Sequence, residues 1–170
     1  MIERPIPEDM PAYYQRYVNT VKESELMESL ENSLRNSLSL FASIGKEKEN
    51  HRYAADKWTV KEVVCHIADC ERIFAYRALR FSRKDATPLS GFNENDYTPN
   101  VNAVGRSFKQ IVDEYTAVRH ASLELFKYQT PDMLNFRGTA NNSPITSRSI
   151  GWIIAGHNTH HCNILRERYL

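Results

Sequence analysis

Three of the six histidines in this chain of 170 residues fall close together, at His157, His160 and His161. His157 and His161 are four positions apart. On a helix their side chains therefore share one face, with Cβ atoms about 5–6 Å apart. Two imidazoles in this arrangement can bind one divalent metal ion, but a third ligand must come from another segment. His66, inside an earlier stretch with helical periodicity, is the candidate.

A site built from His66, His157 and His161 has the ligand count of a catalytic centre. Three protein ligands leave at least one coordination position open, whereas structural metal sites are usually closed by four. A metal ion bound in this way lowers the pKa of its water, polarises a substrate oxygen or stabilises a thiolate. The alternative interpretation is that these are ordinary helix histidines, because the short H-x-x-x-H pattern often occurs without a metal.

Two neighbours on the last helix narrow the chemistry. Asn158 follows the first histidine of the pair, where zinc proteases have the glutamate that acts as general base. Peptide hydrolysis by that arrangement is therefore disfavoured. His160 is three residues from His157 and adjacent to His161, so it does not fully share a face with both. We expect His160 to lie beside the ligands or face water, although it could replace one of them.

Asp69 and Cys70 follow His66 by three and four residues, near its helix face. A carboxylate there can orient an imidazole or act on metal-bound water, so Asp69 is the predicted catalytic residue. The alternative for Asp69 is an ion pair with a nearby arginine. Cys70 would close the site as a fourth ligand, but a free cysteine is usually a small buried hydrophobe.

Four amphipathic stretches must position these residues. Capping boxes at Thr59–Glu62 and Ser107–Gln110 mark two helix starts, and Thr146 can cap the last helix. No strand-like alternation appears. The sequence predicts one all-α domain over residues 1–170, a four-helix bundle with long inter-helix connections. A short helix at 12–21 precedes the four, and the predicted ranges are 24–44, 60–83, 107–128 and 146–168.

The connections 84–105 and 130–145 are longer than usual. The first can form a lid, a wall of the site or a crossover along the bundle, the second is another irregular stretch, and both leave the helix directions open. Asn93, Asp96 and Tyr97 are candidates for such a wall. In the second main helix we expect Leu79 in the core, together with Tyr76. The arginines of that helix are expected on its wetter side, at Arg72, Arg77, Arg80 and Arg83. The alternative for Arg77, as for Arg148, is to bind an anionic substrate.

Composition excludes several classes of protein. Lys and Arg total 22 against 21 Asp and Glu, so no strongly basic balance points to nucleic acid. The longest apolar run, residues 150–155, is too short to span a membrane. No secretion signal is visible, and the three cysteines follow no zinc-finger spacing. We therefore expect a cytoplasmic protein with reduced thiols.

Several longer motifs resemble the DinB/YfiT-like family. They are the stretches at 57–63 (KWTVKEV), 66–72 (HIADCER) and 74–77 (FAYR), and the last helix at 154–161 (IAGHNTHH) with 165–169 (LRERY). The loop at 88–92 and the segment at 137–140 are also similar, so the resemblance covers nearly the whole chain. Cys70 stands where the family commonly has threonine.

The resemblance implies a four-helix bundle in which His66, His157 and His161 bind a divalent metal, often zinc or nickel. It also implies a homodimer, as in many members. Some members resemble S-transferases that use the thiols bacillithiol or mycothiol, one branch includes a maleylpyruvate isomerase, and others are described as metal-dependent hydrolases. The family name reflects an association with DNA damage rather than DNA binding.

The leading functional hypothesis is a metal-dependent enzyme that transfers a low-molecular-weight thiol to a small electrophile. Metal-assisted hydrolysis of a small substrate is the second hypothesis. The third is a non-enzymatic, stress-associated binding protein whose metal is structural. The number of protein ligands separates these hypotheses, because a fourth ligand such as Cys70 would favour a structural role.

Overall fold

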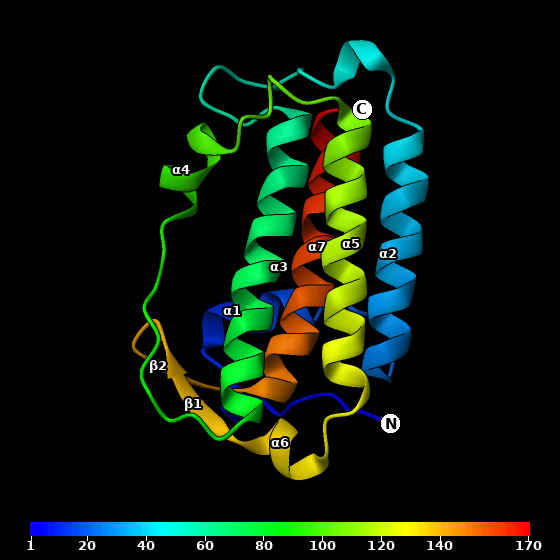
Figure 1. Cartoon of the computed structure of the whole chain (residues 1–170). Helices are drawn as coiled ribbons and strands as arrows, with labels where there is room; N and C mark the ends of the chain where they lie inside the picture. Colours follow the sequence, from blue (N-terminus) through cyan, green and yellow to red (C-terminus); the bar gives the residue numbers. More distant parts are fainter.

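The computed structural model describes all residues from 1 to 170. Its four long helices form a bundle (Figure 1): α2 (Leu26–Ala42), α3 (Val60–Ser82), α5 (Phe108–Lys127) and α7 (Ser147–Arg168). Both α3 and α2 pack against α7 and against α5, so the order around the bundle is α2–α7–α3–α5. The predicted four-helix bundle is confirmed, with each long helix within two residues of its expected limits.

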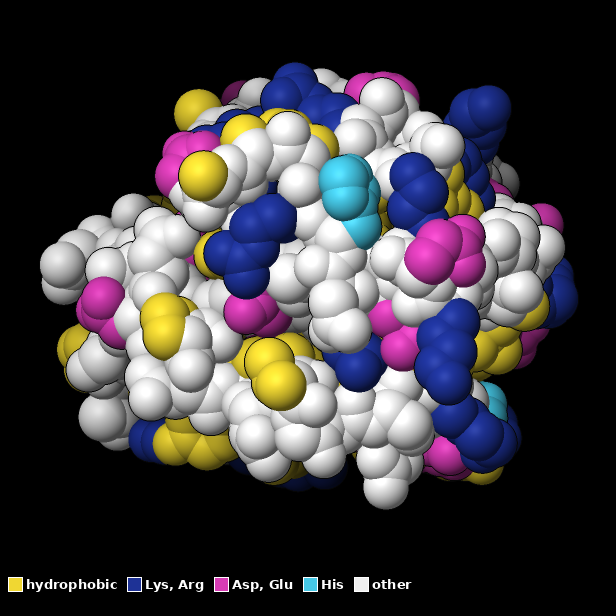
Figure 2. Space-filling view, turned by 90° about the horizontal axis from the view of Figure 1, so that it is seen from above, with side chains coloured by type: hydrophobic (Ala, Val, Ile, Leu, Met, Phe, Trp, Pro, Cys, Tyr) yellow, Lys and Arg dark blue, Asp and Glu magenta, His cyan; other side chains and the backbone are white.

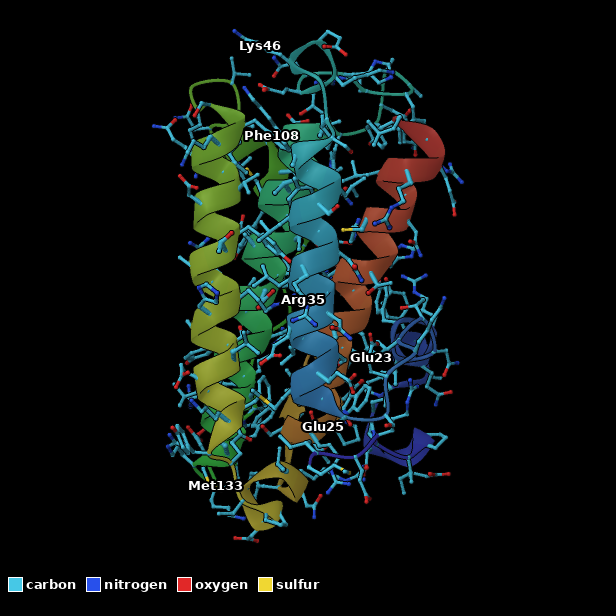
Figure 3. All side chains as sticks on the ribbon, turned by 90° about the vertical axis from the view of Figure 1, so that its right-hand side faces the viewer. Glu23, Glu25, Arg35, Lys46, Phe108 and Met133 are labelled. Atoms are coloured by element: carbon cyan, nitrogen blue, oxygen red, sulfur yellow. The ribbon has the colours of Figure 1, made fainter.

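The direction of the helices explains the long connection after α3. In Figure 1, α2 and α7 run upward, whereas α3 and α5 run downward, so the neighbours α3 and α5 are parallel. Figure 3 shows Lys46, just beyond α2, at the same end of the bundle as Phe108, where α5 begins. The chain must therefore travel the length of the bundle between α3 and α5. This crossover contains the short helices α4 (Glu94–Tyr97) and Thr98–Asn100.

The predicted caps begin the helices that bear the site. At α3, the Thr59 hydroxyl accepts a bond from the Glu62 backbone N–H at 3.2 Å, and the Glu62 carboxylate accepts one from the Thr59 N–H at 2.7 Å. Ser107 and Gln110 make the same reciprocal pair before α5. Thr146 accepts from the backbone of Ser149 at 3.1 Å, which begins α7. Local sequence therefore determines where each of these helices starts.

A β-hairpin, which the sequence prediction did not include, precedes α7. Strands β1 (Arg137–Ala140) and β2 (Ser143–Thr146) pair antiparallel. The two residues between them, Asn141 and Asn142, have φ angles of 49° and 58°. A two-residue hairpin turn with both φ angles positive matches the strand twist, and asparagine tolerates that conformation. The Asn-Asn pair was thus the available sequence signal.

The hairpin is fixed to α3 and to the crossover. Gly138 lies against Phe81 so closely that an added Cβ would be 2.2 Å from the ring. Leu89 forms a parallel bridge with Ala140, in which its backbone N–H donates to Thr139 at 2.9 Å. The hairpin and the crossover therefore form one wall beside the bundle.

The remaining short elements lie outside the four long helices. They are the 3-10 turns Pro7–Asp9 and Lys46–Lys48, helix α1 (Ala12–Val18) and helix α6 (Pro131–Asn135). Helix α1 packs along α7. At their contact, a Cβ added to Gly156 would lie 2.1 Å from the Tyr17 carbonyl oxygen, so only glycine permits this approach. None of the helices combines the length and apolar composition needed to cross a bilayer.

The core contains two apolar clusters and a buried ion pair. Trp152 is fully buried in one cluster and Ile111 nearly so in the other. Glu71 and Arg119 pair in the interior through two bonds of 2.8 Å. Two expectations about α3 were wrong, because Leu79 is 39% exposed and Tyr76 is 51% exposed.

A third expectation about α3 was also wrong. Arg77, assigned to the wetter side of the helix, is only 4% exposed.

Figure 2 shows the upper end of the bundle, where Lys and Arg side chains are interspersed with Asp and Glu side chains. That face therefore bears no continuous patch of one sign.

Candidate metal centre

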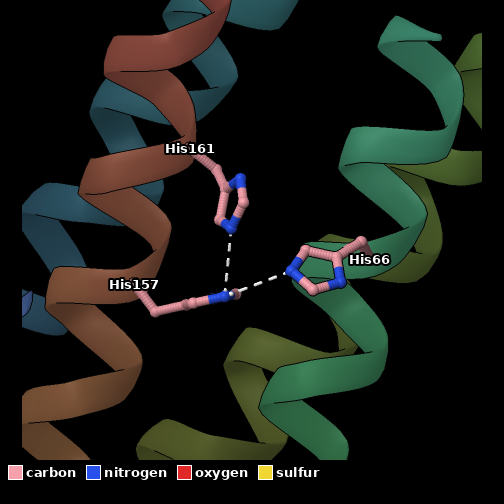
Figure 4. Close-up of side chains that lie close together, drawn as sticks. All are labelled: His66, His157 and His161. Atoms are coloured by element: carbon pink, nitrogen blue, oxygen red, sulfur yellow. Dashed lines mark hydrogen bonds between the residues drawn. The ribbon is translucent and has the colours of Figure 1, made fainter. Parts of the chain in front are cut away.

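His66, His157 and His161 converge between α3 and α7 (Figure 4). The Nε2 atom of His157 lies 3.2 Å from that of His66 and 3.1 Å from that of His161. All three potential ligand atoms lie within 4.8 Å of one another. The antiparallel course of α3 and α7 brings together side chains that are 91 positions apart in sequence.

These distances fit a shared metal ion. Nitrogens bound at about 2.0–2.1 Å from one tetrahedral ion lie about 3.3 Å apart. A neutral imidazole nitrogen has either one hydrogen or one lone pair. The Nε2 atom of His157 has two nitrogen neighbours. It cannot make an ordinary hydrogen bond to both, whereas one cation can accept all three lone pairs.

Burial keeps the three imidazoles in the form that binds metal. It lowers the pKa of His66 to about 4. Burial, followed by the nearby His161 and His66, holds the pKa of His157 well below its usual value. Burial and the nearby His66 and His160 do the same for His161. All three rings are therefore neutral at pH 7, with lone pairs available for a metal.

Asn158 fixes the orientation of α7 about its own axis, and therefore the direction in which its histidines point. Its amide donates to the Ser37 hydroxyl at 2.8 Å and to the Ser33 carbonyl at 3.3 Å, both on α2. Its carbonyl accepts from the Tyr115 hydroxyl of α5 at 3.1 Å. The residue in the protease glutamate position is therefore bonded to α2 and α5, while His157 faces α3.

The histidines open into a cavity of about 540 Å³. Helix α1 closes one side, where the Tyr17 ring lies 5.3 Å from the rings of both His157 and His160. Trp58 lies 4.6 Å from the His66 ring. The crossover and the hairpin supply the opposite wall. Other residues that line the cavity are Tyr14, Cys70, Phe74, Arg77, Phe92 and Glu94.

The predicted catalytic residue Asp69 is not brought to the histidines. It lines a different cavity with Asp96 and Tyr97, and its carboxylate accepts a bond of 3.3 Å from Arg72. Burial raises the pKa of Asp69, and Arg72 offsets part of that rise. The ion-pair alternative therefore describes the position of Asp69, and the expectation that its carboxylate faces the three histidines was wrong.

Cys70 and His160 lie beside the three converging histidines rather than among them. The Cys70 sulfur is 3.6 Å from both ring nitrogens of His66. It does not join the three histidines in the group whose ligand atoms all lie within 4.8 Å of one another. Burial raises the pKa of the Cys70 thiol, so it remains protonated. His160 is half-buried against Tyr17.

The crossover does line the site, but through residues other than the expected ones. Gly91, Phe92 and Glu94 reach the histidine cavity. Asn93 instead caps α4 by accepting from the backbone of Asn95 at 3.1 Å. Phe74, which the sequence assigned to the core, and Arg77, for which anion binding was the alternative to a surface position, also line the cavity.

A sequence signal for these residues existed. With His66 and Cys70, they recur at spacings of four, four and three, which is one face of a helix.

Comparison with protein families identifies this architecture. The model of the DinB superfamily matches residues 29–165. The chain therefore belongs to the DinB superfamily. The match includes all three histidines of the candidate metal centre. A search of curated proteins found no match.

One solved structure shares the fold of this DinB superfamily member. It is described as "YfiT from Bacillus subtilis is a probable metal-dependent hydrolase with an unusual four-helix bundle topology". The TM-score is 0.71 at 14% sequence identity, and the alignment covers 97% of this chain and 91% of the other. At that identity the likeness establishes the fold.

Proposed function

We propose that this DinB superfamily member is a divalent-metal-dependent enzyme that transfers a low-molecular-weight thiol to a small electrophile. The observation that supports this function best is the convergence of three histidine nitrogens on a cavity of about 540 Å³. Such a site has three protein ligands, and an exogenous group can take the open position.

The protein contributes ligands, shape and a partly apolar wall. A divalent ion bound to His66, His157 and His161 would supply a Lewis acid that lowers the pKa of a thiol or a water molecule. Trp58 and Tyr17 cover the histidines from two sides. These rings limit the access of bulk water and provide surfaces against which an electrophile can be positioned.

The choice of thiol over water rests on the carboxylates of the cavity. Glu94, on the crossover, is the one carboxylate that lines it, and it is not among the converging groups. A thiol has a pKa of about 8.5, so it needs only a small shift to ionise near pH 7. Water begins at about 15.7, and hydrolysis gains more from a positioned general base. The site therefore suits thiol activation better.

Hydrolysis of a small substrate is the second candidate. Its support is the description of YfiT, a protein of the same fold, as a probable metal-dependent hydrolase. The third hypothesis, a structural metal, would require a fourth protein ligand. The Cys70 sulfur lies 3.6 Å from both nitrogens of His66, but it does not belong to the group whose ligand atoms all lie within 4.8 Å of one another. This geometry favours an open position and thus an enzyme.

The decisive test is a screen of metal-loaded protein with two panels of substrates. One panel pairs bacillithiol, mycothiol or glutathione with a fluorogenic bimane electrophile, and the other contains small esters and amides. We expect turnover with at least one thiol, and its loss in His157→Ala and after chelation. Turnover of the esters or amides alone would favour the hydrolase. No turnover in either panel, at full metal occupancy, would contradict an enzymatic function.

A further inference from the structure

The cavity contains a buried positive charge without an acidic partner. Arg77 is 4% exposed, and none of the ion pairs of the chain includes it. Burial of a charged group is unfavourable unless the charge is paired. The other buried arginine, Arg119, satisfies this requirement because it donates two hydrogen bonds to the Glu71 carboxylate.

Arg77 has donors to spare. A guanidinium group has five N–H donors in a planar fork. One nitrogen, Nη2, donates to the Ser90 carbonyl at 2.8 Å, which ties the crossover to α3. The guanidinium carbon also lies 6.0 Å from the centre of the Phe74 ring. Arg77 also interacts with the Tyr14 hydroxyl as a side-chain hydrogen-bond partner. The group is thus held in place against the cavity, and the donors of its fork that remain can bind an anion.

Arg77 and His66, one of the three converging histidines, lie on the same stripe of the cavity wall. His66, Cys70, Phe74 and Arg77 follow one another along a single face of α3, and all four line the cavity. Phe74 lies between the two polar ends, because its ring centre is 6.0 Å from the His157 ring and 6.0 Å from the Arg77 guanidinium carbon. One small molecule that lies along the Phe74 ring can therefore contact both the histidines and Arg77.

The other charged groups of the cavity do not neutralise Arg77. Arg16 is exposed, donates to the Tyr17 hydroxyl at 2.8 Å and stacks on Tyr13, with its guanidinium carbon 4.0 Å from the ring centre. Glu94 lies more than 4.0 Å from every basic group, since it forms no ion pair. The nearby Tyr14 has a pKa that burial raises and that the charge of Arg77 partly lowers. The cavity therefore favours an anion beside Arg77.

We infer that Arg77 binds a carboxylate or a similar oxyanion of the molecule that reacts at the three histidines. This inference rests on the proposed function only for the reacting end of that molecule. The expected substrate is an acidic small molecule whose reacting group lies at the histidines and whose anionic group lies on the other side of the Phe74 ring, at Arg77. Arginine suits this role because its fork binds a carboxylate through two parallel hydrogen bonds.

The test compares ligands that differ only in charge. Mercaptohexanoate and mercaptohexanol have the same chain and the same thiol, and their binding to Co²⁺-loaded protein is followed by the sulfur-to-cobalt charge-transfer band. We expect the wild type to bind the carboxylate at least about tenfold more tightly, as for other charged hydrogen bonds. Arg77→Met should remove this preference and leave the affinity for mercaptohexanol unchanged.

Two further variants make the result specific. Arg77→Lys keeps the charge but not the planar fork, so it should retain part of the preference for mercaptohexanoate. If Arg77→Met does not fold, Arg77→Lys takes its place, and its preference should be weaker than that of the wild type. Arg80→Gln, one turn further along α3 and outside the cavity lining, should behave like the wild type. An equal affinity for the two thiols in the wild type, or an undiminished preference in Arg77→Met, would overturn the inference.

A metal-free arm separates this inference from the proposed function. Hexanoate and hexanamide are titrated into metal-free protein, and the indole N–H signal of Trp58, which lines the cavity, reports binding by NMR. Preferential binding of hexanoate that depends on Arg77 supports the anion site even if no cobalt–thiolate band appears, which would count against thiol chemistry alone. The absence of that preference contradicts the anion site whatever the metal does. This arm also shows whether the site accepts an anion that lacks a thiol.

Discussion

The Nε2 atoms of His66 and His157 lie 3.2 Å apart, although their residues belong to different helices of the bundle. Their approach depends on the antiparallel packing of α3 and α7 and on the distance of each histidine from the capped start of its helix. The same His157 nitrogen lies 3.1 Å from His161. Because one imidazole nitrogen cannot bond both neighbours through a single hydrogen or lone pair, this contact is the main physical argument for a metal.

Asn158→Ala should destabilise the protein and weaken metal binding. The substitution removes the acceptor of the buried Tyr115 hydroxyl and the amide that donates to the Ser37 hydroxyl. Loss of a buried hydrogen-bond partner lowers the free energy of unfolding by about 1–3 kcal/mol. Urea unfolding measures this change. Asn163→Ala, an exposed position on the same helix, is the control and should have little effect. Equal stability of the two variants would refute the assigned role of Asn158.

Glu71→Ala should be among the most damaging substitutions in the core. It leaves the guanidinium of Arg119, which is fully buried, without a counter-charge. Breaking such a pair from one side decreases stability by about 3–5 kcal/mol. The double variant Glu71→Leu with Arg119→Leu removes both charges and should recover much of that loss. If the double variant is as unstable as Glu71→Ala in denaturant unfolding, the unpaired charge is not the cause.

The metal-free protein should lose stability as the pH falls from about 6.5 toward 4. Burial lowers the pKa of His66 to about 4 in the folded state, while the unfolded chain takes up the proton near 6.5. The unfolded state therefore binds more protons in this range, so acid favours unfolding. The slope is about 1.4 kcal/mol per pH unit for each histidine affected. Urea midpoints across this range provide the measurement.

His66→Asn is the control for this pH dependence. Its slope should be shallower than that of the wild type by the contribution of one proton. If the wild type and His66→Asn have the same slope, His66 takes up its proton at the same pH in the folded and the unfolded state, which contradicts the prediction.

Short-range signals predicted the frame of the site well. The capping boxes at Thr59 and Ser107 determined where α3 and α5 begin, because a cap depends on residues three positions apart. The four-residue spacing of His157 and His161 placed both on one helix face for the same reason. The bundle itself followed from the apolar periodicity of its four helices.

Long-range features were less accessible. A connection as long as 84–105 permits either direction for the next helix, so the parallel packing of α3 and α5 was left open. Arg77 was assigned to the surface because arginine usually is, and only the packed crossover buries it. Asp69 lies three residues after His66, yet it turns toward Arg72 and a different cavity.

Some expectations concern properties that the fold does not test. The homodimer implied by the family resemblance stays a prediction, and so do the cytoplasmic location and the identity of the metal as zinc or nickel. Sedimentation measures the first directly. The three buried cysteines, none of them in a disulfide, agree with reduced thiols.

Metal content tests the central claim most directly. The protein should be purified with a tag that does not bind metal, without a nickel column, and its metal measured by elemental analysis beside His157→Ala, His161→Ala and the control His120→Ala, an exposed residue of α5. The account predicts near-stoichiometric divalent metal in the wild type and His120→Ala, and little in the other two. A metal-free wild type that binds no added zinc or nickel, or equal metal in all four proteins, would contradict it.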